Sequence, residues 1–74
     1  MEMNVKMYVA EAIAKIEKTD GKKRIVSECR LFVRQKDAEE WCDKVFEDPT
    51  TVWDAWCKPT IHSVKVYEMI PEVA

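Results

Sequence analysis

The dipeptide Asp20-Gly21 is the feature that most constrains how this chain folds. It stands between two long runs rich in apolar and β-branched residues. Asp-Gly in such a place is the strongest short-range signal for a β-hairpin, because both residues tolerate a positive φ. With Asp20 and Gly21 as the two loop residues, we expect strands near residues 4–18 and 23–35.

The two-residue loop fixes an expected register for the hairpin. In that register Glu17 faces Arg24 and Glu11 faces Arg30, so the charges that meet on one face have opposite sign. The other face carries the apolar pairs Ile16–Ile25, Ala12–Cys29, Ala10–Leu31 and Tyr8–Val33. Because a slip of one residue moves every side chain to the other face, this register predicts which residues reach the core.

Part of the first strand also fits a helix. Residues 10–16 have high helix propensity, and Val9, Ala12, Ile13 and Ile16 would share one helical face. The charge pairing across the hairpin favours the strand, with the helix as the alternative.

A single amphipathic helix is expected over residues 38–47. Asp37 and Glu40 have the spacing of a capping box at its start, and Asp48-Pro49 ends it. Its apolar stripe consists of Ala38, Trp41, Cys42, Val45 and Phe46. A further short helical turn is expected within residues 49–56, with Val52, Trp53 and Trp56 on its inner side.

Residues 60–70 are rich in β-branched and aromatic residues, and Val64 and Val66 alternate with Lys65 and Tyr67, which predicts a third strand that ends at Pro71. A helical crossover places this strand beside the first one. The expected fold class is α+β: a ββαβ domain over residues 1–74, with a three-stranded antiparallel sheet in the order 2-1-3 and one helix packed on one face.

In outline the chain resembles a loose group of small proteins common in bacteriophages and prophages. The matching segments are Ala38-Glu39-Glu40-Trp41, in the helix, and Val64-Lys65-Val66-Tyr67-Glu68, in the closing strand. Members of that group with known roles are often inhibitors that bind host defence machinery, anti-CRISPR proteins among them. The resemblance implies a phage protein that binds a protein partner in the cytoplasm of the host cell.

Composition excludes several classes of protein. The net charge of −2 argues against a general polyanion binder. No signal peptide is visible at the N-terminus, and no apolar run approaches the roughly 20 residues that span a bilayer. Three cysteines, an odd number without close spacing, argue against a secreted disulfide scaffold and favour a reducing cytoplasm.

The residues that could carry chemistry are few. Cys29, Cys42, Cys57 and His62 are the only soft metal ligands, and no two of them have the close spacing of a zinc site. The single glycine is taken by the hairpin turn, which leaves none for a phosphate-binding loop. We therefore expect no catalytic site, no metal and no cofactor.

Three surfaces remain as candidate binding sites. The first is the outer face of the sheet, away from the helix, where the expected register places Met7, Val9, Ile13, Val26 and Phe32. The second is an acidic stripe on the helix formed by Glu39, Asp43 and Glu47, with Trp53 and Trp56 as candidate anchors beyond it. The third is a basic hairpin tip made by Lys18, Lys22, Lys23 and Arg24.

The sequence therefore predicts a small non-catalytic protein-binding module that acts through the outer sheet face, the acidic helix or both. A second copy of the chain is one candidate occupant of the outer face, which would make a homodimer. The alternative is an accessory protein that binds nucleic acid through its lysine-rich tip. A membrane role is not expected.

Overall fold

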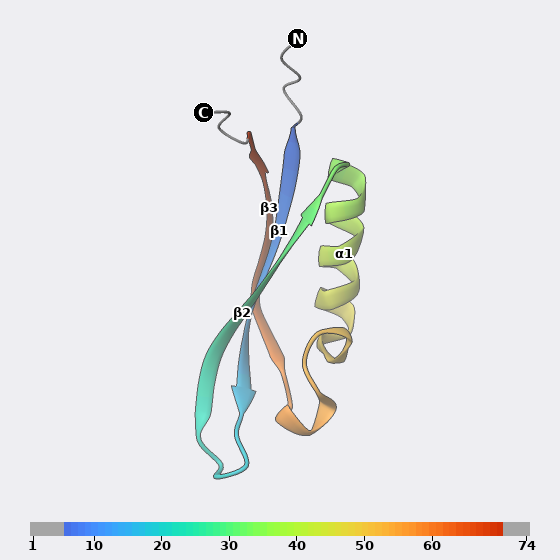
Figure 1. Cartoon of the computed structure of the whole chain (residues 1–74). Helices are drawn as coiled ribbons and strands as arrows, with labels where there is room; N and C mark the ends of the chain where they lie inside the picture. The colour runs from blue at the N-terminus through green and yellow to red at the C-terminus, as the bar shows by residue number, and fades with distance from the viewer. Residues whose placement is uncertain (1–5, 71–74) are drawn as a thin grey trace.

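The computed structural model describes residues 6–70, so residues 4 and 5 of the expected first strand lie outside the described part. Figure 1 shows a long β-hairpin, a helix lying along one face of the sheet, and a third strand that returns beside the first. The strands are β1 (Met7–Glu17), β2 (Lys23–Phe32) and β3 (Thr60–Met69), and the helix is α1 (Gln35–Glu47). All neighbouring strands are antiparallel and their order is β2-β1-β3, which confirms the predicted ββαβ fold.

The hairpin register differs from the expected one by a single residue. Glu17 pairs with Lys23, not Arg24, and Glu11 pairs with Cys29, not Arg30. The loop has three residues instead of two: Gly21 takes φ 82° and donates its N–H to the carbonyl oxygen of Lys18 at 2.9 Å. This is the geometry of a three-residue loop whose last residue is left-handed, a conformation that glycine adopts at no steric cost.

The helix-facing side of β1 is made of small residues. Ala10, Ala12 and Ala14 are fully buried there, and Ala10 packs against Ala38 and Cys42 of α1. Side chains without bulk on the central strand let the helix approach the sheet closely. The larger apolar groups around this contact are half-buried: Tyr8, Phe32, Trp41, Val64 and Val66.

The helix begins one turn earlier than predicted. Its N-cap residue is Arg34, which makes no side-chain capping bond, and Asp37 lies inside the first turn, where its charge suits the helix dipole. The predicted capping box of Asp37 and Glu40 is therefore wrong. The predicted apolar stripe holds for its buried members, but Phe46 is 64% exposed.

Two short 3₁₀ turns connect α1 to β3, as the prediction of an extra helical turn requires. They are η1 (Pro49–Thr51) and η2 (Ala55–Cys57). The Asp48 side chain caps η1 by accepting a hydrogen bond from Thr50 N–H at 3.1 Å. Lys58 follows η2 with φ 48°, and this left-handed residue turns the chain into β3.

Candidate functional site

The outer face of the sheet, defined here as the side opposite α1, carries rows of residues that cross all three strands. One row consists of Leu31, Val9 and Tyr67, and Met7 pairs with Met69 in the row beyond it. Val9 is buried between its two neighbours although no described element covers this face, whereas Leu31 and Tyr67 are 55% and 43% exposed. Hydrophobic side chains therefore form a continuous surface at the end of the sheet nearer the termini.

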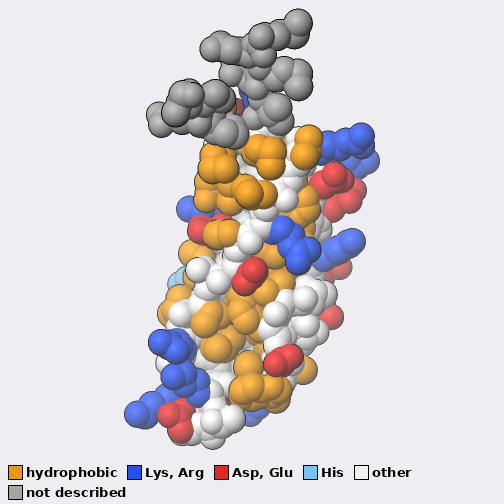
Figure 2. All heavy atoms as spheres, viewed as in Figure 1, with side chains coloured by type: hydrophobic (Ala, Val, Ile, Leu, Met, Phe, Trp, Pro, Cys, Tyr) orange, Lys and Arg blue, Asp and Glu red, His pale blue; other side chains and the backbone are white. Residues whose placement is uncertain are grey.

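Figure 2 shows hydrophobic side chains at the surface over much of the molecule, including the end next to the terminal residues drawn in grey. Basic side chains gather at the lower left, where Figure 1 places the hairpin turn, and again at the upper right, where α1 begins. In this view the hydrophobic side chains are most prominent near the terminal residues, and the hairpin end is the more basic end of the sheet.

A charged row borders the hydrophobic rows on the outer face. Glu11 on β1 lies between Cys29 on β2 and Lys65 on β3. Its carboxylate is 3.2 Å from Lys65 Nζ and accepts a hydrogen bond from Cys29 Sγ at 3.4 Å. Hydrogen bonding to Lys65 first, and then to Cys29, holds the pKa of Glu11 below its ordinary value. Lys65 Nζ also lies 5.4 Å from the centre of the Tyr67 ring, which ties this row to the hydrophobic one.

The register correction changes which residues form this face. Met7, Val9 and Ile13 lie on the outer face as predicted, but Val26 and Phe32 lie on the helix side. Phe32 pairs with Tyr8 and its ring centre is 6.4 Å from that of Trp41 in α1. The outer-face positions on the flanking strands that the prediction missed are Ile25, Cys29, Leu31, Tyr67 and Met69.

The acidic stripe on α1 is exposed at all of its members, Glu39, Asp43 and Glu47. Glu39 accepts a hydrogen bond from Gln35 Nε2 at 3.1 Å. Of the two candidate anchors, Trp53 is half-buried and Trp56, predicted to face inward, is 60% exposed in η2. Trp56 therefore remains available to a partner, but from a different part of the molecule than the hydrophobic rows.

The basic tip is exposed at Lys18, Lys22, Lys23 and Arg24. Asp20 lies among them, and its carboxylate accepts the backbone N–H of Lys22 at 2.9 Å. Two further charges meet nearby, since Lys58 Nζ lies 3.8 Å from Glu17. Acidic groups are thus interleaved with the lysines, which dilutes the field that a nucleic-acid backbone would feel.

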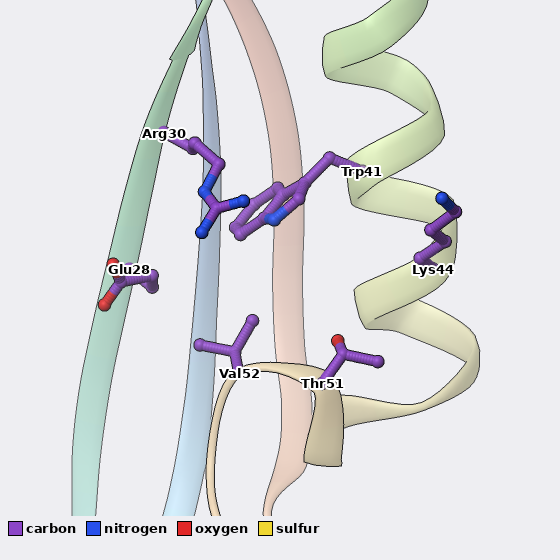
Figure 3. Close-up of a pocket in the computed structure, with 6 residues that line it drawn as sticks. All are labelled: Glu28, Arg30, Trp41, Lys44, Thr51 and Val52. Atoms are coloured by element: carbon purple, nitrogen blue, oxygen red, sulfur yellow. The ribbon is translucent and has the colours of Figure 1, made fainter.

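The helix side of β2 forms an open cleft of about 390 Å³ beside α1. Figure 3 shows Arg30 pointing from β2 toward Trp41 of the helix, with Val52 and Thr51 beneath them and Lys44 farther along α1. The cleft exists because the residues of β1 paired with Glu28 and Arg30 are Ala12 and Ala10, which do not fill the space. Its lining combines both signs of charge with one aromatic ring.

The soft metal ligands do not come together. Cys29 is exposed on the outer face, whereas Cys42 is buried on the helix side and its thiol lies 3.7 Å from the carbonyl oxygen of Lys65. His62 is exposed in β3, where the pairing with β1 is irregular. Within residues 6–70 no group of three or more His, Cys, Asp or Glu side chains has the arrangement of a metal site.

Two of the cysteine thiols are held in their protonated form. Shielding from water, followed by the hydrogen bond to Glu11, raises the pKa of Cys29. Burial, followed by the charges of Asp43 and Glu39, raises the pKa of Cys42. A raised pKa disfavours the thiolate, which is the nucleophilic form.

No helix among residues 6–70 has the length and apolar character needed to cross a membrane. In comparisons with known proteins, no family model, curated protein or solved structure matches the chain. The geometry of the surfaces described above is therefore what bears on function.

Proposed function

We propose that this chain is a non-catalytic protein-binding module whose binding surface is the outer face of the sheet. The observation that supports it is the hydrophobic row formed by Leu31, Val9 and Tyr67, which no described element covers. Large apolar groups gathered on one face of a small domain are typical of a surface that a partner buries. At about 25 cal/mol per Å², covering a few hundred Å² there contributes several kcal/mol.

The charged row beside this surface would fix the orientation of a bound partner. The ion pair between Glu11 and Lys65 lies at the surface, so it contributes little to stability by itself. At the edge of a hydrophobic contact the same pair offers a fixed acceptor and a fixed donor to polar groups of the partner. The raised pKa of the neighbouring Cys29 thiol fits a binding role better than a nucleophilic one.

The test is capture of a partner from a cell extract on immobilised protein, with Tyr67→Glu as the disrupting variant. The resemblance to phage proteins implies a bacterial host, so the extract is bacterial. Phe46→Glu is the matched control, because it places the same charge at an exposed aromatic position on α1 instead of on the outer face. Circular dichroism checks that both variants remain folded.

We expect a protein that is retained by the wild type and by Phe46→Glu and lost with Tyr67→Glu. Identical retention by the two variants would show that the outer face is not the binding surface. Loss with Phe46→Glu alone would move the binding surface to the helix.

A further inference from the structure

We propose that the free edge of β2 pairs antiparallel with β2 of a second copy of this chain, in a two-fold dimer centred on Cys29. This inference concerns the edge of the sheet, whereas the proposed protein-binding surface is its outer face, so neither depends on the other. The resulting sheet would run through both copies and leave both outer faces open.

The two edges of the sheet differ in how well they are protected. β3 has an irregular pairing between Ile13 and Ala14 of β1, and Pro59 directly precedes it. Bulges and prolines are among the devices by which edge strands avoid pairing with other chains. β2 pairs over its whole length without a register shift, contains no proline, and has no described strand on its other side. β2 is therefore the edge open to another strand.

The hydrogen bonds of the hairpin show which residues of β2 face the free edge. Lys18 N–H donates to the carbonyl oxygen of Lys22 at 2.7 Å, which makes this pair the first hydrogen-bonded rung between the two strands. Hydrogen-bonded rungs fall on alternate residues, so the even-numbered residues of β2 point their backbone groups toward β1. The residues whose backbone groups point outward are Ile25, Ser27, Cys29 and Leu31.

With a two-fold axis at Cys29, the outward-pointing N–H and C=O groups of Ser27, Cys29 and Leu31 all form hydrogen bonds with the second copy. Cys29 then pairs with the partner's Cys29, and Ser27 pairs with the partner's Leu31, twice by symmetry. These rungs supply about six backbone hydrogen bonds between the copies. Backbone hydrogen bonds of this kind provide the affinity when a strand adds to the edge of a sheet.

The side chains select this register among its neighbours. With the axis at Cys29, Glu28 faces the partner's Arg30 at two symmetric positions, and Val26 faces the partner's Phe32. An axis at Glu28 would place Glu28 against itself, and an axis at Arg30 would do the same for that residue. Both side chains are exposed, and the ion pairs among the described residues involve neither of them.

The helix side of β2 leaves room for a second chain. The cleft of about 390 Å³ beside α1 is lined by Glu28 and Arg30 from the strand, so both side chains reach open space and not a packed core. In the dimer the two clefts lie on either side of the axis. Paired β2 strands then form the floor between the two helices.

Charge reversal gives a test that only this register passes. Glu28→Arg sets the new arginine against the partner's Arg30, and Arg30→Glu places two glutamates together, so each variant alone should associate roughly tenfold more weakly or worse. Mixing the two variants restores opposite charges at both positions. We therefore expect a heterodimer in the mixture, measured as a doubled mass by light scattering and as a mixed species by native mass spectrometry.

Lys36→Glu and Asp43→Arg are the matched controls, since they reverse exposed charges on α1 that do not line the cleft beside β2. We expect both to dimerise like the wild type. A wild type that stays monomeric at every concentration overturns the proposal. So does a dimer that either β2 variant leaves intact, or a mixture that remains monomeric.

Amide hydrogen exchange of the wild-type protein is the second measurement and needs no variant. We expect Ser27, Cys29 and Leu31 to gain protection as protein concentration rises, because their N–H groups bond across the axis. Unchanged exchange at these amides in a protein that does dimerise would assign the contact to another surface. The Tyr67→Glu capture experiment is independent of both outcomes, since Tyr67 lies on β3.

Discussion

The two faces of the sheet differ in the size of the side chains that the central strand β1 presents and in what covers those side chains. On the helix side, β1 presents Ala10, Ala12 and Ala14, which are fully buried, and Ala10 packs against Ala38 and Cys42 of α1. On the outer side it presents larger residues such as Val9, which is buried only by its cross-strand neighbours. The helix side is covered by α1, whereas no described element covers the outer side, where Leu31 and Tyr67 remain exposed.

The difference shows how small the internal core is. The only fully buried side chain larger than alanine is Val45, among the residues that the structure describes. A chain of 74 residues has little net stability to spare, so each buried contact matters. Substitutions at adjacent residues, which point to opposite faces, separate the two roles.

The largest effect is expected from a charge placed on the helix side of β1. Ala12→Glu buries an unpaired carboxylate beneath the helix, which costs several kcal/mol and is comparable to the whole stability of such a domain. We expect this variant to be unfolded at room temperature by circular dichroism. Ile13→Glu is the control one residue along, because its side chain points to the outer face. A folded Ala12→Glu protein would mean that the helix does not cover the alanine face.

A smaller effect is expected from the neighbouring residues Phe32 and Leu31 on β2. Phe32→Ala removes the contact with Trp41 and should lower the free energy of unfolding by about 2 kcal/mol. Leu31→Ala changes an exposed side chain and should cost less than about 1 kcal/mol. Urea denaturation measures both. Equal losses, or a larger loss at Leu31, would argue for the two-residue loop and the opposite assignment of faces.

The smallest effect concerns the charged row on the outer face. Lys65→Met removes the partner that chiefly lowers the pKa of Glu11, so the pKa of that carboxyl should rise toward its ordinary value in a carbon-detected NMR titration. Because the folded-state pKa of Glu11 is depressed, its contribution to stability is present above the unfolded-state pKa and is lost as pH falls through the folded-state pKa. The melting temperatures of the wild type and Glu11→Gln should therefore converge in acid. A difference that persists at low pH would contradict this assignment.

The element order could be predicted from the sequence because each element carries a local signal. Asp20-Gly21 marked the hairpin, the spacing of Ala38, Cys42 and Val45 marked the helix, and these signals act within a few residues of the chain. The start of the helix was harder to place, since Asp37 suits both an N-cap and a first turn. In the structure the helix begins at Gln35, with Arg34 as its N-cap residue and Asp37 in its first turn.

The register could not be predicted because two registers satisfy the same rules. Lys22, Lys23 and Arg24 are consecutive, so Glu17 meets a basic residue whichever way the strands slip. Leu31 and Phe32 are likewise consecutive, so an apolar residue falls on either face. The structure decides between them through the hydrogen bond from Lys18 N–H to the carbonyl oxygen of Lys22, which leaves three residues in the loop.

The length of that loop determines which side chains of β2 lie on the outer face of the sheet. β2 is nearly two-sided in its hydrophobicity, so its own sequence does not determine which set of side chains the protein displays. The hairpin turn determines it, because the turn sets the register between β1 and β2, and the register decides which side chains lie on each face. Closing the loop on two residues, with Thr19 paired to Lys22, would leave the composition of β2 untouched and exchange the displayed set for the hidden one. The conformation of the hairpin loop thus controls the identity of a surface formed many residues away.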